Sequence, residues 1–564
     1  MLLSDRSQSE RFPVNVGWRL SETAVRDPRG IAIVEPVGRE ANGRRRYRQV
    51  TFAELEDDTN RIAAGLQAMG VQPQTRLVLL VRPGIDFIAL VFALFKAGVV
   101  TVLIDPGMGR RHLLRCLAEA QPEGFVAIPL AHAVRRLFAH RFPRSRHLVT
   151  VGTRWFWGGT TLDTLRKTPA ASLRRPETLN NDPAAIIFTT GSTGPPKGVL
   201  YEHGNFDRQV DELRHVYQIQ PGEIDLPGFP LFALFNAAMG VTTVIPEMDF
   251  TRPAAADPRK ILEIALDWQV TQAFGSPALL NLIGRYCEQQ AVRLPSLRRV
   301  LSAGAPVPPH VLRRMQAAIA SEGEIHTPYG ATEALPVATI SAREVLRETA
   351  PMSEEGKGTC VGRRFPGIEW RVIQIDDGPL EEIAMTRPVP AGEIGELMVR
   401  GPVVTRQYIT RLEANPLHKV VDGNTFWHRM GDVGYLDQDD RFWFCGRKNH
   451  RVQTSQGTLF TIPCEAIINR HPRVYRSALV GVGRPGNQRP VIVAEPWPES
   501  RSRSATDARN FLNELRSLAA SHPLTSSIRD FFIQNSLPVD IRHNAKIFRE
   551  KLAVWAASRL DRQP

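Results

Sequence analysis

Short apolar runs alternate with longer helical patterns along the first half of the chain. Residues 75–81 predict a buried strand, residues 85–96 an apolar helix, and residues 99–104 a second strand that ends at Asp105 and Pro106. A strand, a helix and a strand in that order form a βαβ unit, which implies a parallel sheet. The same alternation predicts strands at 184–189, 272–274 and 299–302 and helices at 206–217 and 260–268.

The pattern changes after about Gly362. Residues 395–400 and 441–444 predict short antiparallel strands, and a domain boundary is expected between residues 446 and 447. The tail predicts a small α+β domain, with helices at 464–470 and 507–521 and strands at 478–482 and 491–495. A length of 564 residues also exceeds what one apolar core usually holds, which favours more than one domain.

Composition narrows the class of protein. An apolar fraction of 43% and a charged fraction of 23% are typical of a soluble globular protein. The five cysteines include no close pair, so we expect neither a zinc site nor a disulfide framework. The N-terminus lacks a signal-peptide pattern, and no apolar stretch is long enough to span a bilayer. These features favour a cytoplasmic location, and they leave peripheral contact with a membrane open.

The formal net charge of +13 raises the question of nucleic acid. Basic residues are spread along the chain, although Arg44, Arg45, Arg46 and Arg48 form one short cluster. No helix-turn-helix, zinc or RNP-type pattern accompanies that cluster. We therefore expect no nucleic-acid partner, and favour a basic surface of the kind that docks an acidic protein.

A run rich in glycine and hydroxyl side chains follows the predicted strand at 184–189. It consists of Thr189, Thr190, Gly191, Ser192, Thr193, Gly194, Pro195, Pro196, Lys197 and Gly198. Glycines let the backbone turn and aim N–H groups at phosphate oxygens, while hydroxyls add donors and the lysine adds charge. The spacing differs from a Walker A loop, in which Gly-Lys-Ser/Thr opens a helix. A flexible surface loop is the alternative for such a run taken alone.

This run resembles the phosphate loop of the adenylate-forming superfamily: acyl-CoA synthetases, adenylation domains of peptide synthetases, and luciferases. Other motifs of that superfamily resemble segments found here in matching order, so the resemblance covers nearly the whole chain. Those segments are 94–106, 301–306, 329–333, Gly431-Asp432, Gly446-Arg447 and Lys546. The resemblance implies an α/β fold with two domains. Residues 1–446 would hold two parallel-rich α/β subdomains and a small β-barrel, and residues 447–564 would form a mobile α+β lid.

The resemblance also implies that ATP and Mg²⁺ bind. Besides the phosphate loop, the residues implied in nucleotide binding are Gly304, Ala305, Pro306, Tyr329, Gly330, Asp432 and Arg447. Tyr329 would stack on adenine, although a tyrosine considered alone is more often part of a core. Asp432 would accept hydrogen bonds from both ribose hydroxyls, because a carboxylate only accepts, and Arg447 would assist at the ribose.

Three further residues are implied in catalysis: Thr332, Glu333 and Lys546. Thr332 would donate a hydrogen bond to the α-phosphate, and Glu333 would hold Mg²⁺, a cation that prefers oxygen ligands. Lys546 would neutralise charge on the carboxylate and the α-phosphate as pyrophosphate leaves. Its context, Asn-Ala-Lys, departs from the common Ser-Gly-Lys. At the hinge, His450 stands where Asp or Lys is usual.

Residues 229–236 correspond to the start of the acid pocket in the superfamily. The stretch is Phe-Pro-Leu-Phe-Ala-Leu-Phe-Asn, with no carboxylate to pair with an amino-acid substrate. A long apolar acyl chain therefore fits better than an amino acid, and plain core packing is the alternative. Ala233 also departs from the His that many acyl-CoA ligases carry here.

Taken as a whole, the chain most resembles the β-lactone synthetases of bacterial long-chain olefin biosynthesis. That resemblance implies activation of a 2-alkyl-3-hydroxyalkanoate as its acyl-AMP, followed by attack of its own 3-hydroxyl to give a β-lactone. It implies as partners the reductase that makes the hydroxy acid and the enzyme that decarboxylates the lactone. A fatty acyl-CoA ligase is the alternative within the same chemistry, and an inert nucleotide-binding scaffold is a remote one. No base for the 3-hydroxyl proton can be named; His203 is near the phosphate loop, but we expect it to cap the next helix.

Overall fold

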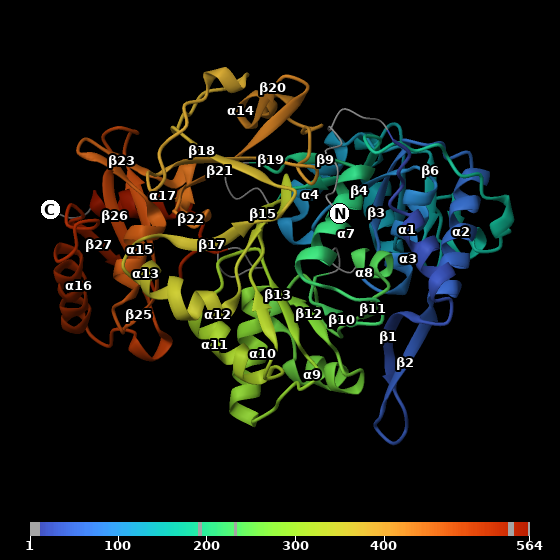
Figure 1. Ribbon diagram of the computed structural model, residues 1–564, viewed down its shortest axis with the longest axis horizontal. Coiled ribbons are helices and arrows are strands. Elements are labelled where there is room, and N and C mark those ends of the chain that lie inside the picture. Colours follow the sequence, from blue (N-terminus) through green and yellow to red (C-terminus); the bar gives the residue numbers. More distant parts are fainter. Residues whose placement is uncertain (1–11, 190–194, 230–233, 540–545, 562–564) are drawn as a thin grey trace.

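The computed structural model describes residues 12–189, 195–229, 234–539 and 546–561. Two parallel-rich sheets and a third, antiparallel sheet make up the part of the chain before residue 448 (Figure 1). The C-terminal residues form a separate set of strands and helices at the opposite end of the long axis from β6 (Figure 1). This arrangement agrees with the α/β class expected from the sequence.

The first sheet has the strand order β7-β6-β5-β3-β4-β8-β9, and every pairing is parallel except that of β8 with β9. Its strands are β3 (Arg76–Leu80), β4 (Val100–Leu103), β5 (Gly124–Ala127), β6 (His147–Thr150), β7 (Thr160–Thr161), β8 (Pro183–Phe188) and β9 (Gly198–Glu202). Helix α3 (Ile85–Lys96) connects β3 to β4, which confirms the predicted βαβ unit. The buried amine of Lys96 bonds to Glu56 (2.5 Å), and so the apolar helix tolerates a charge at its end.

The second sheet has the order β14-β13-β12-β10-β11-β1-β2, with only the β1–β2 hairpin antiparallel. Its strands are β1 (Ile31–Arg39), β2 (Arg45–Thr51), β10 (Ile224–Pro227), β11 (Thr242–Val244), β12 (Gln272–Gly275), β13 (Arg299–Ser302) and β14 (Glu324–His326). One large apolar cluster contains residues of both sheets, such as Ile33 and Leu77, so the two sheets share a core. The helices contributing to that core are α1 (Trp18–Arg26), α2 (Phe52–Ala68), α3, α7 (His203–Val216) and α8 (Leu234–Met239).

The remaining faces of the two sheets are covered by other helices. In the first sheet, α4 (Arg110–Glu119) and α5 (Pro129–Leu137) lie on the face opposite the shared core, where Leu117 and Phe142 pack on Phe125 and Phe188. On the second sheet, α9 (Pro258–Asp267), α10 (Pro277–Gln290) and α11 (Pro309–Ala318) form a separate cluster with Val300. Parallel sheets need such cover on both faces, because their strands are apolar throughout.

The third sheet is antiparallel, in the order β15-β16-β17-β22-β21-β19-β18, with β20 beside β21. Its strands are β15 (Tyr329–Ala331), β16 (Ala334–Thr339), β17 (Thr359–Arg364), β18 (Glu369–Ile373), β19 (Gly395–Arg400), β20 (Lys419–Asp422), β21 (Thr425–Leu436) and β22 (Arg441–Arg447). It takes the place of the predicted small β-barrel. Within the described residues, no pairing between β15 and β18 closes it into a barrel.

Beyond β22 the chain builds a smaller α+β unit with its own sheet, β25-β26-β27. Its larger elements are α15 (Thr461–Asn469), β25 (Val474–Val482), β26 (Arg489–Pro496), α16 (Ala505–Ala520), β27 (Asp530–Ile533) and α17 (Arg549–Leu560). Its two apolar clusters draw only on residues from Val452 onwards. The domain boundary at 446/447 stays a prediction.

Short elements complete the chain: α6 (Leu162–Leu165), α12 (Ala342–Glu344), α13 (Ala350–Glu354), α14 (Asn415–His418), β23 (Val452–Thr454) and β24 (Gly457–Leu459). All five cysteines are buried and free, as the sequence predicts. Among the described residues, no helix is both long enough and apolar enough to cross a membrane.

Candidate active site

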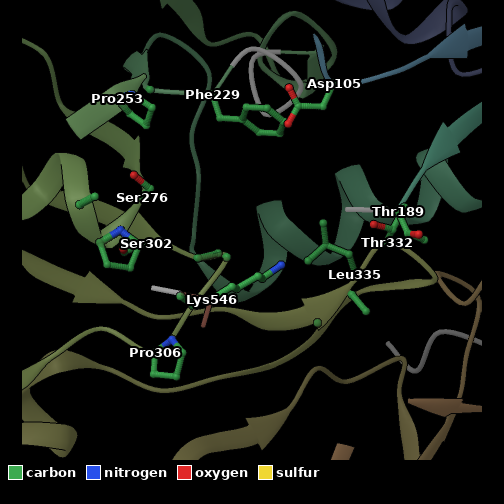
Figure 2. A pocket seen from close by; sticks show the side chains of 18 of the residues that line it. Asp105, Thr189, Phe229, Pro253, Ser276, Ser302, Pro306, Thr332, Leu335 and Lys546 are labelled. Carbon is green, nitrogen blue, oxygen red and sulfur yellow. The ribbon is translucent and has the colours of Figure 1, made fainter. Parts of the chain in front are cut away.

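A continuous cavity of about 3620 Å³ lies where the carboxyl ends of the parallel strands meet the third sheet and the C-terminal unit. Open α/β folds commonly bind ligands at that edge of the sheet. Every described residue predicted for the site lines it: Thr189, Lys197, Gly304, Ala305, Pro306, Tyr329, Gly330, Thr332, Glu333, Asp432, Arg447 and Lys546. Figure 2 shows Lys546 entering the cavity from below, with Thr332 and Leu335 to one side and Pro306 and Ser302 to the other. The predicted phosphate-loop residues Thr190, Gly191, Ser192, Thr193 and Gly194 lie outside the described residues.

The two ends of the phosphate loop are fixed against each other. The Thr189 N–H donates to the Lys197 carbonyl (3.0 Å), and the Lys197 N–H donates to the Thr189 hydroxyl oxygen (3.0 Å). Strands β8 and β9 pair directly before and after them. The loop therefore projects from a rigid base at the carboxyl end of β8.

Thr332 and Glu333 occupy the turn between β15 and β16, where Ala331 faces Ala334. A Cβ atom on Gly330 would lie 2.6 Å from the Ala334 carbonyl oxygen, so this tight turn requires glycine there. The Tyr201 hydroxyl donates to the Thr332 carbonyl (2.6 Å). These contacts hold the two predicted catalytic side chains at the cavity wall.

Asp432, Tyr329 and Arg447 form a ribose-side cluster. Asp432 on β21 and Arg447 on β22 are cross-strand partners, with Arg447 Nη1 2.8 Å from Asp432 Oδ1. The Tyr329 hydroxyl donates to the other carboxylate oxygen, Oδ2. Burial raises the pKa of Asp432, and Arg447 and the Tyr329 hydroxyl oppose that rise. Burial and the neighbouring carboxylate together raise the pKa of Tyr329. One carboxylate here balances one guanidinium.

A second group surrounds Glu333 and forms a phosphate-side cluster with Tyr408, Lys197, His418 and Lys419. The Tyr408 hydroxyl donates to Glu333 Oε1 (2.6 Å), and the Lys197 ammonium lies 4.8 Å from the centre of the Tyr408 ring. Burial alone would raise the pKa of Glu333, but the Tyr408 hydrogen bond, Lys197 and Lys419 outweigh it and lower that pKa. Glu333 is therefore an ionised carboxylate at neutral pH.

Lys197 is oriented by His418. The Lys197 Nζ lies 3.1 Å from His418 Nε2, and His418 Nδ1 lies 3.3 Å from the Arg429 carbonyl oxygen. An ammonium only donates and a carbonyl only accepts, so Nδ1 carries the proton and Nε2 accepts from Lys197. Burial and then Lys197 lower the pKa of His418 to about 4, which keeps the ring neutral.

Lys419 adds a second buried amine, which donates to the Thr405 carbonyl. Burial lowers the pKa of Lys419 to about 7, with Glu333 opposing and Lys197 reinforcing the shift. Tyr408, His418 and Lys419 were not predicted from the sequence. Their partners Glu333 and Lys197 are 75 to 221 residues away along the chain, and no local spacing marks them.

Lys546 belongs to the C-terminal unit and enters the cavity from a short segment before α17. Arg549, three residues later, donates through Nη2 to both carboxylate oxygens of Glu465 on α15 (2.7 and 2.8 Å). The Leu479 N–H also donates to Glu465 (2.8 Å). Burial raises the pKa of Glu465 to about 7, with Arg549 the main opposing charge. This anchor fixes the position of the segment that carries Lys546.

At the hinge, His450 lines the cavity and its Nε2 lies 3.2 Å from Glu550 Oε1 on α17. His203 does not behave as expected. It is fully buried as the first residue of α7, away from the cavity lining, and burial lowers its pKa to about 3. The helix is capped instead by Glu202, which forms a capping box with Asn205. The sequence-based expectation that His203 caps the helix is wrong, and the structure gives it no route to a substrate hydroxyl.

The acid-binding side of the cavity is apolar. Of the stretch 229–236, residues 230–233 lie outside the described residues, whereas Phe229, Leu234 and Phe235 line the cavity. Further apolar lining comes from Met248, Phe250, Phe274, Pro277, Leu282 and Tyr286. Asn236 is buried and donates to Asp225 (2.7 Å), so it serves the core rather than the site. An alkyl chain suits these walls better than a charged group does.

The residues present suit a magnesium ion only in company with a substrate. Among the described residues, no cluster of three or more His, Cys, Asp or Glu could hold a metal ion. Glu333 supplies one ionised carboxylate at the cavity wall. Mg²⁺ is usually held by one or two carboxylates together with substrate phosphates and water. A single carboxylate beside a phosphate loop fits that pattern.

Comparison with protein families decides the class. Residues 20–409 match the family model described as AMP-binding enzyme. The chain belongs to the AMP-binding enzyme family. Members use ATP, in agreement with the superfamily resemblance of the sequence motifs. The matched range ends before Asp432, Arg447 and Lys546, so those residues rest on the geometry described above.

Curated relatives match over nearly the whole chain. An olefin β-lactone synthetase of Xanthomonas campestris pv. campestris is 47% identical over 550 residues, covering 96% of this chain and 97% of the relative. A second, from Stenotrophomonas maltophilia, is 45% identical and covers 98% and 99%. A feruloyl-CoA synthase of Amycolatopsis is 29% identical over 77% of this chain and 81% of the relative. The chain is thus far more similar to the two lactone synthetases than to that CoA ligase.

Solved structures show the same fold. The anthranilate-CoA ligase AuaEII in complex with anthranoyl-AMP aligns with a TM-score of 0.78, 18% identity and coverage of 99% and 100%. The amide bond synthetase McbA from Marinactinospora thermotolerans aligns with a TM-score of 0.74, 23% identity and coverage of 96% and 99%. At these identities the likeness concerns the fold alone.

Proposed function

We propose that this AMP-binding enzyme converts a long-chain 2-alkyl-3-hydroxy acid and ATP into a β-lactone, AMP and pyrophosphate. The observation that carries the proposal is the full-length identity to two olefin β-lactone synthetases. The cavity supports it, because Thr332, Glu333 and Lys546 line the same space as an apolar wall. Acid activation and a greasy substrate are both compatible with such a site.

In the first step the substrate carboxylate attacks the α-phosphate of ATP, and the bond to pyrophosphate breaks. A carboxylate is a poor electrophile, and the mixed anhydride gives its carbonyl carbon a good leaving group, AMP. We propose that Thr332 donates to the α-phosphate and that Lys546 neutralises the charge shared by carboxylate and phosphate. Mg²⁺ bound by Glu333 and the phosphates would supply charge neutralisation of the triphosphate.

The nucleotide would be held by the two clusters on either side of the reacting phosphate. We propose that Asp432 and Arg447 bind the ribose, that Tyr329 and Gly330 together with Gly304, Ala305 and Pro306 hold the adenine, and that Thr189 and Lys197 bind the outer phosphates. The masked part of the phosphate loop, Thr190, Gly191, Ser192, Thr193 and Gly194, is proposed to share that last task. Each assignment joins the superfamily resemblance with a place on the cavity wall.

In the second step the substrate's 3-hydroxyl oxygen attacks the activated carbonyl carbon. A four-membered ring closes, the bond to AMP breaks, and the hydroxyl proton is released. Nucleophile and electrophile belong to one molecule, so proximity is built into the substrate and CoA is not required. Water must be kept from the anhydride, and the apolar wall of the cavity favours that exclusion.

Further proposals follow from the same function. Residues 447–564 are proposed to act as a mobile lid that delivers Lys546, and residues 1–446 as the domain that binds ATP and acid. We propose a cytoplasmic enzyme that receives its substrate from a hydroxy-acid-forming reductase and passes its lactone to a decarboxylating enzyme. No nucleic acid takes part in this scheme.

A fatty acyl-CoA ligase is the second candidate, because several relatives of 24–29% identity are CoA ligases or synthases. Such an enzyme shares the first step and passes the acyl group to a thiol. An inert nucleotide-binding scaffold is a remote third candidate, and its retention of Glu333, Asp432 and Lys546 in one cavity would have no purpose.

The deciding experiment supplies purified protein with MgATP and a synthetic 2-alkyl-3-hydroxy acid, with and without CoA. AMP is quantified, and the organic product is identified by NMR without heating, because β-lactones decompose when hot. AMP together with a β-lactone in the absence of CoA supports the proposal. A thioester formed only with CoA makes the protein an acyl-CoA ligase, and no acid-dependent AMP across a broad panel of acids favours the scaffold.

The role of Lys546 has its own test. Lys546→Ala is expected to slow acid-dependent ATP–pyrophosphate exchange by about 10²–10³-fold, the usual effect of losing one preorganised donor. Lys551→Ala, which removes an exposed lysine on α17, is the matched control. Full exchange activity in Lys546→Ala would remove that lysine from the mechanism.

A further inference from the structure

Helix α5 on the outer face of the first sheet is inside out. Its outward stripe consists of Leu130, Val134 and Leu137, which are 68%, 39% and 75% exposed. Its buried side holds His132 and Arg135, which are 0% and 7% exposed. Surface helices ordinarily place the apolar stripe toward the core and the charged residues toward water. The inversion means that α5 presents its apolar stripe, at i, i+4 and i+7, to the outside.

Two aromatic side chains extend this stripe. Trp155 and Phe156 are 51% and 78% exposed and belong to the loop after β6. The next residue, Trp157, is buried: its ring stacks on His132 of α5 at 5.4 Å, and its Nε1 donates to the Thr150 hydroxyl oxygen (2.9 Å). The loop is therefore fixed against α5. Strands β5 and β6 are parallel neighbours, so Leu130 and the aromatic loop follow the same edge of the sheet.

The exposed apolar side chains gather here rather than scatter. Among the described residues, five of the fourteen large exposed apolar side chains fall between residues 130 and 156. Single exposed apolar residues are ordinary, whereas a contiguous group marks a contact surface. We call this group, Leu130, Val134, Leu137, Trp155 and Phe156, the outer apolar patch.

The segment that carries the outer apolar patch is strongly basic. Residues 129–160 contain six arginines and no aspartate or glutamate. Five of these arginines are exposed: Arg136, Arg141, Arg144, Arg146 and Arg154. The nearby carboxylates are already paired, Glu123 with Arg146 (3.3 Å) and Glu119 with Arg115 and Arg411 (2.9 and 3.0 Å). The surface thus combines apolar and aromatic side chains with excess positive charge.

The outer apolar patch is also continuous with the active site. The cavity that contains Lys197 and Thr332 is lined further out by Leu113, Val134 and Leu137. A molecule that lies on α5 therefore has an uninterrupted path over the carboxyl edge of the sheet to the reacting groups. For an acid with long alkyl chains, which partitions into lipid, such a path matters.

We propose that α5 and the aromatic loop dock this enzyme on an anionic lipid surface. Trp and Phe side chains insert at the level of the lipid head groups, and arginines pair with lipid phosphates. An acidic protein would match the arginines but gives no reason for the exposed Leu130, Leu137 and Phe156. The contact is peripheral and needs no spanning helix. It does not depend on which acid the enzyme activates.

The test measures sedimentation of the full-length protein with sucrose-loaded vesicles. Vesicles of phosphatidylcholine alone are compared with vesicles that also contain phosphatidylglycerol. We expect binding to the anionic vesicles, and much weaker binding when NaCl is raised from about 0.1 M to about 1 M, where the Debye length falls from about 10 Å to about 3 Å.

Two sets of variants separate charge from insertion. Reversing Arg136, Arg144 and Arg154 to Glu should lower the partition coefficient by at least roughly a hundredfold, since each basic residue near the membrane contributes about a factor of five. Trp155→Ser with Phe156→Ser should lower it by roughly tenfold or more. The matched controls are Arg29→Glu with Arg347→Glu and Arg516→Glu, and Val25→Ser with Val554→Ser, all at exposed positions outside the segment. Each variant is first shown to unfold at the wild-type temperature.

Each alternative occupant has its own outcome. Absent binding, or equal loss in patch and control variants, overturns the proposal. Binding to polyglutamate that matches the anionic vesicles and ignores Trp155→Ser with Phe156→Ser would make the surface a site for acidic polypeptides instead. A lipid-free dimer in analytical ultracentrifugation that the patch variants dissociate, with no vesicle binding, would make it an interface between copies. Vesicle binding needs no turnover, so these results are independent of the proposed lactone chemistry.

Discussion

The ribose-side and phosphate-side clusters are built on opposite principles of charge. In the ribose-side cluster, Asp432 faces Arg447 and the Tyr329 hydroxyl, so one negative group meets one positive group. In the phosphate-side cluster, the single carboxylate of Glu333 faces two amines, Lys197 and Lys419, both with lowered pKa values. The first cluster is balanced without any ligand, whereas the second has an excess of positive charge.

This difference identifies which part of a nucleotide each cluster suits. Lowered pKa values of two neighbouring lysines mean that each opposes the ionisation of the other in a partly desolvated place. A polyanion such as a triphosphate with its metal removes that opposition, while a neutral ribose does not. Balanced polar groups suit hydroxyl recognition, since they exchange one hydrogen bond for another at little cost. Charge imbalance is thus a sign of the phosphate end even before the motifs are considered.

The largest expected effect comes from Glu333→Gln. The change removes the one carboxylate that the phosphate-side cluster has, and with it the proposed metal ligand. Acid-dependent ATP–pyrophosphate exchange should fall about 10²–10³-fold. Glu413→Gln, a carboxylate on the same cavity wall, is the control and should leave the rate unchanged. A Glu333→Gln rate within threefold of wild type would contradict the comparison of the two clusters.

Asp432→Asn comes next. The change leaves one acceptor and unbalances Arg447, so the dissociation constant for ATP should rise roughly tenfold to a hundredfold, as for a hydrogen bond to a charged group. Wild type should prefer ATP to 2′-deoxy-ATP, and the variant should lose that preference. Isothermal titration with both nucleotides measures it, with the exposed Asp439→Asn as control. Unchanged discrimination in Asp432→Asn would place the ribose elsewhere.

His418→Phe should have a smaller effect, about fivefold to tenfold on the KM for ATP, with kcat little changed. The ring keeps its volume but no longer accepts from the Lys197 ammonium, so Lys197 is less well oriented. His418→Gln, whose amide oxygen can accept, should restore most of the loss. Lys197→Met and His418→Phe should be strongly non-additive, because both remove the same contact. Additive effects would show that His418 acts independently of Lys197.

The smallest effect concerns a buried carboxylate outside both clusters. Asp225 on β10 has Asn236 as its hydrogen-bond donor, and burial raises the pKa of Asp225 to about 7. Between its usual value near 4 and about 7 the folded protein holds a proton that the unfolded chain has lost, so stability falls as pH rises through that window. Above about pH 7 the loss is complete.

Asp225→Asn stays neutral and can still accept from Asn236. Urea unfolding should therefore find the variant similar to wild type at pH 5 or below and more stable by at least about 1 kcal/mol at pH 8.5. Asp267→Asn, on the exposed end of α9, serves as control. Equal stabilities of wild type and Asp225→Asn at pH 8.5 would mean that Asp225 is ionised at no cost.

Much of this molecule could be predicted because its signals are local. Helix α3 begins and ends at the predicted residues, and β13 and β19 also match, since long apolar runs between turn residues leave few alternatives. The predicted site residues that the structure describes all line one cavity, because their motifs were read as one superfamily pattern.

What the sequence did not reveal depends on contacts between distant residues. His418 becomes relevant only through Lys197, 221 residues away. The burial of His203 and the outward stripe of α5 follow from which helix face meets the sheet, and amphipathicity alone predicts the reverse for α5. The closure of the third sheet likewise depends on pairing between strands far apart in the chain, which no local pattern specifies.

The hydrogen bond from Tyr329 to Asp432 has a consequence for turnover. In the ligand-free enzyme this hydroxyl already satisfies the oxygen that a ribose would otherwise use. Arrival of a nucleotide therefore substitutes one donor for another, and departure lets the tyrosine return at once. A product that shares the ribose with ATP leaves no desolvated carboxylate behind it, so AMP need not remain bound for want of a replacement. The same contact that limits tight binding of the nucleotide thus helps the enzyme begin its next cycle.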